Sequence, residues 1–196
     1  QAETGWLKRQ GLRLVVDLSS GVDLYPTLRL LENVPADYQT SMTAISNVLA
    51  KMEILGARDL ILPLHRHPEN NFTDEQVRSG FTATLKTLAS EAAAHGVTLH
   101  LRIAPGKPPR SLAEGLTWLD RIGAENVKLA VSVALLANNL PPPAPASRLK
   151  DALGLWLVSG SRTDVAGTTW DVHAPIHSAL PPSALAQALT LAPSSP

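Results

Sequence analysis

The chain has 196 residues, with 17 lysine and arginine residues against 17 aspartate and glutamate residues and no cysteine. A formal net charge of zero gives no basic surface for nucleic acid and no attraction to an anionic membrane, so we expect neither partner. The absence of cysteine excludes disulfides, thiolate nucleophiles and Cys-ligated zinc, and it leaves the cellular compartment undetermined. No apolar run approaches the roughly 20 residues that span a bilayer. The chain starts at Gln1 without a signal-peptide pattern, so we expect a cleaved leader or a longer parent polypeptide.

The first part of the chain alternates strand-like and helix-like segments. Residues 11–18 form an apolar, β-branched run that starts at a glycine and stops at a Ser-Ser-Gly turn, which predicts a buried strand. Residues 40–55 predict a helix, and Gly56 follows as a C-cap. A second strand is predicted at residues 60–64, although Pro63 has no N–H to donate to a sheet. The apolar face of the predicted helix consists of Met42, Ile45, Val48, Leu49, Met52 and Leu55.

The middle of the chain repeats this pattern with clearer helix ends. Thr73, followed by acidic residues, predicts the start of a helix that ends near Gly96. Ser111 and Glu114 have the spacing of a capping box, and Gly123 stops the helix that follows. Further strands are predicted after these two helices, at residues 97–103 and 127–133.

The last third of the chain is less regular. A proline-rich stretch at residues 141–145 predicts a stiff, extended spacer. A short helix at 147–152 and a fifth strand at 155–158 follow, after which the polar residues 159–169 predict a loop. A sixth strand is predicted near 169–173, a last helix at 184–191 and a frayed tail at 193–196.

Strands and helices that alternate at intervals of roughly 30–40 residues predict right-handed βαβ units and a parallel sheet. The fold class is therefore α/β, as a shortened or partial (β/α) barrel or as an open parallel sheet. No glycine-rich phosphate or dinucleotide loop follows a strand, which argues against Rossmann and P-loop folds. We expect one α/β domain over residues 1–196, with a core at about 11–178 and a terminal helix and tail at 179–196.

Three strings carry a family resemblance: Gly-Val-Thr-Leu-His-Leu-Arg at residues 96–102, Asn-Val-Lys-Leu-Ala-Val-Ser at 126–132, and Asp-Val-His-Ala-Pro-Ile at 171–176. With the strand spacing over residues 11–178, the chain resembles the xylose isomerase-like TIM-barrel superfamily. That superfamily includes sugar-phosphate isomerases, epimerases and AP-endonuclease-like proteins. Since a complete eight-unit barrel typically has about 250 residues, the resemblance implies a partial barrel.

The resemblance also implies where metal ligands would stand, and this chain departs from the pattern there. The family's first ligand, a glutamate, is replaced by Arg102. An aspartate and a histidine three residues later are replaced by Ser132 and Leu135, and a further histidine ligand by Trp156 or Val158. No late glutamate follows the third string. Because serine, leucine and tryptophan cannot replace carboxylate or imidazole ligands, we predict a degenerate member that has lost its metal site.

His65 and His67 are the remaining metal-ligand candidates. They follow the second predicted strand, and period-two geometry puts both imidazoles on one face. A metal or phosphate site there requires a carboxylate such as Asp17 or Glu69. The simpler interpretation, which we favour, is a polar loop.

Arg102 ends the third predicted strand, where it would bind a carboxylate or phosphate of a ligand or pair with Asp17 across neighbouring strands. His100 is in phase with Arg102 and is a second ligand-binding candidate. We interpret His100 as a hydrogen-bonded interior residue rather than a catalytic one.

Asp171, His173 and His177 cluster at the last predicted strand, where Asp171 and His173 are candidate acid/base groups, as is Asp17.

Trp156 and Trp170 offer aromatic faces for a sugar, whereas Trp118 fits a helix core. The Ser-Gly-Ser string at residues 159–161 lacks the form of a nucleophile elbow, which excludes a serine hydrolase of that type.

The leading functional hypothesis is a non-catalytic, degenerate sugar-isomerase-like barrel domain, acting as an accessory, structural or carbohydrate-binding module of a larger protein. Its expected partners are other domains of the same polypeptide or a carbohydrate, and no cofactor is expected. The alternative is a sugar isomerase or epimerase, or a hydrolase, that uses a divalent metal at a site rebuilt around His65 and His67. A third possibility is a protein-interaction module whose open sheet edge docks a neighbouring domain.

Overall fold

The structure is a computed structural model that describes residues 14–18, 29–31, 35–62, 64, 72–103, 108–132, 146–163 and 169–177. Of residues 146, 156, 158–163 and 169–177 it describes the backbone only. None of the described helices is long and apolar enough to cross a membrane.

The strands form one sheet in which their order in space follows their order in the chain. The first five strands are parallel, and the sixth is antiparallel to the fifth. Each helix between two parallel strands makes the connection that a βαβ unit requires, as predicted. The strands are β1 (Val15–Asp17), β2 (Asp59–Leu62), β3 (Thr98–Arg102), β4 (Val127–Ser132), β5 (Leu153–Thr163) and β6 (Thr169–His177).

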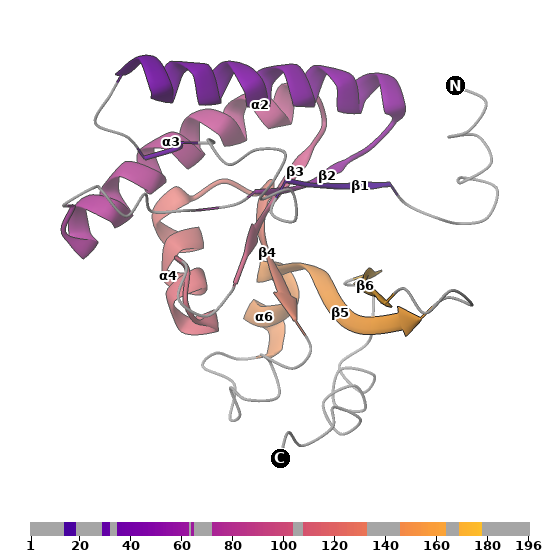
Figure 1. Cartoon of the computed structure of the whole chain (residues 1–196). Helices are drawn as coiled ribbons and strands as arrows, with labels where there is room; N and C mark the ends of the chain where they lie inside the picture. The colour runs from indigo at the N-terminus through magenta and orange to yellow at the C-terminus, as the bar shows by residue number, and fades with distance from the viewer. Residues whose placement is uncertain are drawn as a thin grey trace.

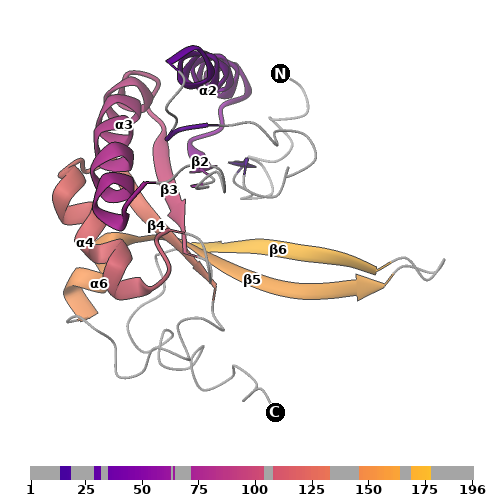
Figure 2. The same cartoon turned by 60° about the vertical axis from the view of Figure 1, so that its left-hand side comes forward.

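The helices cover one face of this sheet (Figures 1 and 2). Figure 2 shows helices along one side of the strands, while the ribbon of β5 and β6 extends away on the other side. The apolar sides of the helices pack on alternate strand residues, among them Leu60, Leu99 and Leu129, and form the main core. The helices are α2 (Pro35–Leu55), α3 (Asp74–Ala94), α4 (Leu112–Ile122) and α6 (Ala146–Ala152).

The prediction that Trp118 packs in a helix core is confirmed. The Trp118 side chain is 1% exposed and its ring lies 5.8 Å from that of Phe81, at an angle of 35°. The contact joins α4 to α3, so this aromatic residue holds helices together and does not face a ligand.

The helix ends follow the local signals of the sequence. The Thr73 hydroxyl accepts a hydrogen bond from the Gln76 backbone N–H, and the Gln76 side chain accepts one from the Thr73 N–H, which makes a full capping box. Glycines in the left-handed region terminate three helices, as expected for residues without a Cβ. They are Gly56 (φ 70°), Gly96 (φ 62°) and Gly123 (φ 67°).

The start of α4 differs from the predicted capping box. The Ser111 hydroxyl accepts from the Glu114 N–H at 3.2 Å, as expected. The Glu114 carboxylate, however, accepts from the Arg110 N–H at 2.7 Å instead of from Ser111. The carboxylate therefore caps the residue before the N-cap.

The structure differs from the prediction at the start of α2, at Leu55 and at the end of β2. The helix begins at Pro35 rather than residue 40, and a proline suits the first helical position. Leu55, expected on the apolar face, is 47% exposed at the end of the helix. β2 ends at Leu62, directly before the proline.

The prediction of a loop at residues 159–169 was wrong for residues 159–163 and for Thr169, and residues 164–168 lie outside the described residues. β5 continues to Thr163, and β6 runs antiparallel to it, so the described part of the predicted loop belongs to a two-stranded ribbon. Polar and apolar residues alternate at the start of β6, as Thr-Trp-Asp-Val-His at 169–173, which is typical of a strand with one polar face. The connection, residues 164–168, is too short for the dozen or more residues that a parallel crossover needs.

Candidate functional site

The sheet face opposite the helices, here called the inner face, carries polar side chains at two levels. Four of its buried residues, Ile61, Ala130, Leu155 and Leu157, form a cluster separate from the main core. Strand periodicity and the pairing of neighbouring strands identify the rest of this face. Its polar residues are Asp17, Asp59, Thr98, His100, Arg102, Lys128 and Ser132.

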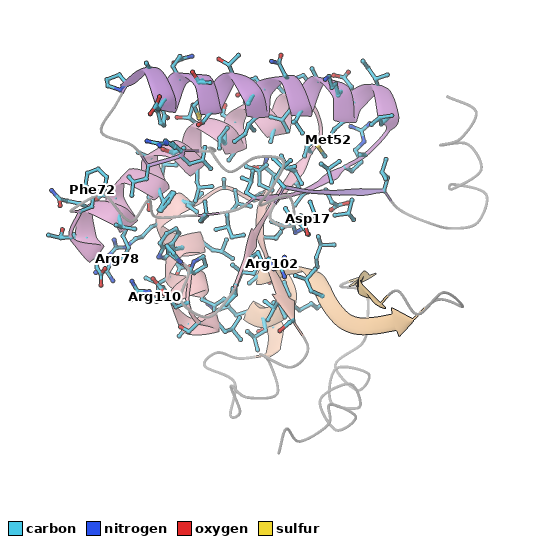
Figure 3. All side chains as sticks on the ribbon, viewed as in Figure 1. Asp17, Met52, Phe72, Arg78, Arg102 and Arg110 are labelled. Atoms are coloured by element: carbon cyan, nitrogen blue, oxygen red, sulfur yellow. The ribbon has the colours of Figure 1, made fainter. Side chains whose placement is uncertain are left out.

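The upper level lies at the carboxyl ends of the strands. Asp17, Arg102 and Ser132 are the last residues of β1, β3 and β4, and we call this group the mouth. The predicted pairing is present, because an Arg102 guanidinium nitrogen lies 3.9 Å from an Asp17 carboxylate oxygen (Figure 3). The Arg102 and Asp17 side chains are 28% and 21% exposed, so both are partly accessible to a ligand. Their pair crosses β2, which separates the two strands.

The lower level is a buried pair. His100 Nε2 lies 2.8 Å from an Asp59 carboxylate oxygen, and each side chain is 1% exposed. His100 is thus an interior, hydrogen-bonded residue, as the sequence interpretation proposed. The pair joins β2 to β3 two residues before Arg102. The prediction of His100 as a ligand-binding residue was wrong, because its side chain is too deeply buried to meet a ligand directly.

Gly154 closes the space beside this pair. It lies where the pairing of β4 with β5 shifts register, between the partners of Leu129 and Ala130. A Cβ at Gly154 would stand 2.4 Å from His100 Cε1 and 2.7 Å from Lys128 Cβ. The glycine therefore allows the imidazole to pack directly against the β5 backbone.

The ribbon carries the remaining candidates whose positions are described. The strand pairing sets His173 opposite Ser159 and Asp171 opposite Ser161. Trp156 is paired with Val131 of the helix-side core and Trp170 with Arg162. Since alternate residues of a strand share a face, Asp171 and His173 stand on one face of the ribbon, and the two tryptophans on the other.

The histidine pair of the sequence analysis lies outside the described residues, as do Glu69 and Leu135. Within the described ranges, no three His, Asp or Glu side chains gather in a way that could hold a metal ion. His177 ends β6, opposite Leu155.

Sequence reasoning did not identify Asp59, Lys128 or Gly154. The available signal for Asp59 was a carboxylate at the start of a wholly buried strand, which requires a partner. Nothing local indicates that this partner is His100, because 41 residues separate the two.

A groove of about 420 Å³ lies between α4 and α6, beside the amino end of β4. Three of its charged side chains, Lys128, Arg148 and Asp120, are engaged within the protein. The Lys128 ammonium donates to the Asp151 carbonyl at 2.6 Å, and the Arg148 guanidinium pairs with the Asp120 carboxylate. No sequence pattern predicted this groove, because it forms only where the two helices meet.

No protein-family model and no curated protein matches the sequence. Solved structures do match the fold. A D-psicose 3-epimerase from Clostridium cellulolyticum H10, with D-tagatose, is 12% identical over 79% of this chain and 55% of its own, with a TM-score of 0.62. A D-psicose 3-epimerase in the presence of D-fructose is 14% identical, over 95% of this chain and 63% of its own, with a TM-score of 0.65. A 3-keto-D-glucoside 4-epimerase from E. coli is 16% identical over 95% of this chain and 70% of its own, with a TM-score of 0.58.

These similarities confirm the predicted fold class: the chain is an α/β protein with a partial (β/α)-barrel fold like that of these sugar epimerase structures. The chain spans 55% and 63% of the length of the two D-psicose 3-epimerases. In barrels of this kind, ligands bind at the carboxyl ends of the strands. The mouth is therefore the candidate functional site.

Proposed function

We propose that this chain is a non-catalytic, sugar-isomerase-like barrel domain that binds a carbohydrate at its mouth, as an accessory module of a larger protein. The proposal depends on one observation, the ion pair between Asp17 and Arg102 at the carboxyl ends of β1 and β3. Its support from the comparisons is that several similar structures are sugar epimerases.

The mouth has the chemistry for hydroxyl groups. Arg102 presents N–H donors, the Asp17 carboxylate presents acceptors, and the Ser132 hydroxyl does both. The guanidinium and carboxylate lie 3.9 Å apart and are partly exposed, so one sugar hydroxyl could hydrogen-bond to both. A hydrogen bond to a charged group is worth more than one between neutral groups.

The same charges disfavour a divalent cation. At a separation of about 5 Å and an effective dielectric constant of about 20, a guanidinium repels such a cation by roughly 7 kcal/mol. The Asp17 carboxylate at a similar distance only cancels this repulsion. The pair therefore offers no net attraction, whereas hard cations are bound by several converging oxygen ligands.

Sugar binding at the mouth is testable with D-fructose and D-tagatose as probes, because both occur in structures of similar fold. We expect them to shift the amide signals of Asp17, Arg102 and Ser132 in NMR titrations of the wild-type chain. Arg102→Ala should weaken binding about tenfold through loss of a charged hydrogen bond.

The matched control is Arg110→Ala. Arg110 is 53% exposed, pairs with Asp74 at 3.4 Å, and lies apart from Arg102 on the helix side (Figure 3). The Arg110→Ala variant should bind both sugars with wild-type affinity. Equal affinities in wild type and Arg102→Ala would contradict the assignment of the mouth.

Metal content separates this proposal from the metal-dependent isomerase, epimerase or hydrolase. After incubation with Mn²⁺, Zn²⁺ and Mg²⁺ and exhaustive dialysis, we expect mass spectrometry to find no stoichiometric metal. Near-stoichiometric metal that is lost in a His65→Ala, His67→Ala double variant would overturn the proposal in favour of the enzyme.

A further inference from the structure

The groove between α4 and α6 has the size of a small-molecule site and lies away from the mouth. Its volume of about 420 Å³ falls within the range of about 300–1,000 Å³ that is usual for ligand pockets. Figure 2 shows α4 and α6 as neighbours on the helix side of the sheet. The groove adjoins the amino end of β4, whereas the mouth lies at the carboxyl ends of the strands. A ligand here therefore occupies a second site.

Part of the groove's lining is apolar. Leu116, Val127 and Ala152 are 6%, 2% and 7% exposed, so the core holds them in place. Leu119 and Ala124 also line the groove and are only partly buried. Covering their exposed surface with a hydrocarbon chain is favourable, because it removes apolar surface from water.

An ion pair connects the two helical walls of the groove. The Arg148 guanidinium of α6 pairs with the Asp120 carboxylate of α4. These two charges neutralise one another, so the pair connects the two helices and adds no net charge to the groove.

Two more charged side chains line the groove, and neither has an ion-pair partner in the described part of the chain. The Lys128 ammonium donates to the Asp151 backbone carbonyl at 2.6 Å. This acceptor is neutral, and an ammonium group has three N–H donors. The Asp151 side chain adds a carboxylate on an exposed residue. Because the carbonyl and the carboxylate belong to one residue, covalent geometry keeps the two opposite charges within about 8 Å of each other.

From these contacts we infer that the groove binds a small zwitterion with an apolar side chain, the chemical class of an apolar α-amino acid. Lys128 binds its carboxylate, Asp151 binds its ammonium group, and the partly buried Leu119 and Ala124 contact its side chain. Charge-assisted hydrogen bonds of about 2.8 Å to each group let such a ligand bridge two charges that do not pair directly. The inference does not depend on the proposed function, because the mouth contributes no residue to the groove.

The test is an NMR titration of the uniformly ¹⁵N-labelled wild-type chain with L-leucine, leucinamide and 4-methylpentanoate. The three compounds share one apolar chain, but leucinamide lacks the carboxylate and 4-methylpentanoate lacks the ammonium group. L-leucine should shift the amide signals of Leu119, Lys128 and Asp151 and leave those of the mouth unchanged. Each analogue should bind about tenfold more weakly, through loss of one charged hydrogen bond.

Two variants assign the charges to their residues. Asp151→Asn keeps the backbone carbonyl that Lys128 binds and removes only the carboxylate. It should weaken L-leucine binding about tenfold and leave that of 4-methylpentanoate unchanged. Lys128→Met should weaken L-leucine binding to the same extent and leave that of leucinamide unchanged. The matched control is Lys150→Met, which removes an exposed lysine of α6 that does not line the groove and should bind like wild type.

Each outcome decides the inference. The expected order of affinities, with shifts at the groove, supports it. Equal affinities for the three compounds would show that the charges take no part and would overturn it. The absence of shifts at the groove with L-leucine would also overturn it, whatever the sugar titration shows at the mouth. Because the comparison of the three compounds uses the wild-type chain, a variant that fails to fold does not prevent the test.

Discussion

Gly154→Ala is expected to lower the free energy of unfolding by about 3 kcal/mol, the upper part of the usual range for overpacking. The new Cβ would stand 2.4 Å and 2.6 Å from two atoms of the His100 ring and 2.7 Å from Lys128 Cβ. The imidazole cannot move aside without losing its 2.8 Å contact with Asp59, and a Cβ moves only with its backbone. Urea denaturation followed by circular dichroism measures the change.

Gly80→Ala is the matched control for this substitution. Its new Cβ would stand 2.2 Å from Leu31 Cδ1, which is the far end of a flexible side chain. Since Gly80 lies within α3, alanine also gains up to about 1 kcal/mol of helix propensity. We expect a net change within about 1 kcal/mol. Equal losses at positions 80 and 154 would mean that the His100 contact has no special cost.

A double-mutant cycle isolates the contact. In a His100→Ala background, the penalty of Gly154→Ala should fall by at least about 1 kcal/mol, because the ring that clashes is gone. If Gly154→Ala destabilises the His100→Ala variant as much as the wild type, the loss of stability comes from the clash with Lys128 or from the β5 backbone.

Asp59→Ala is expected to cost about 3 kcal/mol of stability, because it removes one partner of a buried polar pair. Both side chains are 1% exposed, so water cannot replace the lost hydrogen bond. Asp59→Asn keeps an acceptor oxygen of the same shape, and its loss should be closer to about 1 kcal/mol. Denaturant titration at constant pH compares the two variants.

The chain contains its own control for this prediction. His95 and Glu53 are also a histidine and a carboxylate 2.8 Å apart, but their side chains are 26% and 60% exposed. Glu53→Ala should cost less than about 1 kcal/mol, since an exposed pair gains little over its hydration. Similar losses of stability from Asp59→Ala and Glu53→Ala would contradict the view that burial makes the Asp59–His100 pair important for stability.

The substitutions at Gly154 and Asp59 also bear on function, because they affect the position of Arg102. The Asp59–His100 pair joins β2 and β3 directly below the mouth, and Arg102 follows His100 on the same face of β3. Weakening the lower level should therefore loosen the placement of Arg102. This contribution is one of positioning, since neither Asp59 nor His100 is accessible to a ligand.

The sequence by itself determined what depends on neighbouring residues. Thr73 and the glycines at positions 56, 96 and 123 set helix ends through local hydrogen bonds and backbone freedom. Strand periodicity put His100 and Arg102 in phase, and three short strings indicated the fold that the structural similarities confirm. The short connection at 164–168 also indicates that β6 is antiparallel to β5. The prediction missed this because the polar residues from 159 onward are typical of a loop.

Only the tertiary structure decided which distant residues meet. The Asp59–His100 pair, the Gly154 contact and the 3.9 Å approach of Arg102 to Asp17 each join separate strands. So does the division of the ribbon candidates, which places Asp171 and His173 on one face and Trp156 and Trp170 on the other. Periodicity fixes the phase of residues within one strand, but the register between strands sets which residues of different strands stand side by side. That register is determined by packing across the whole sheet, and no local pattern contains it.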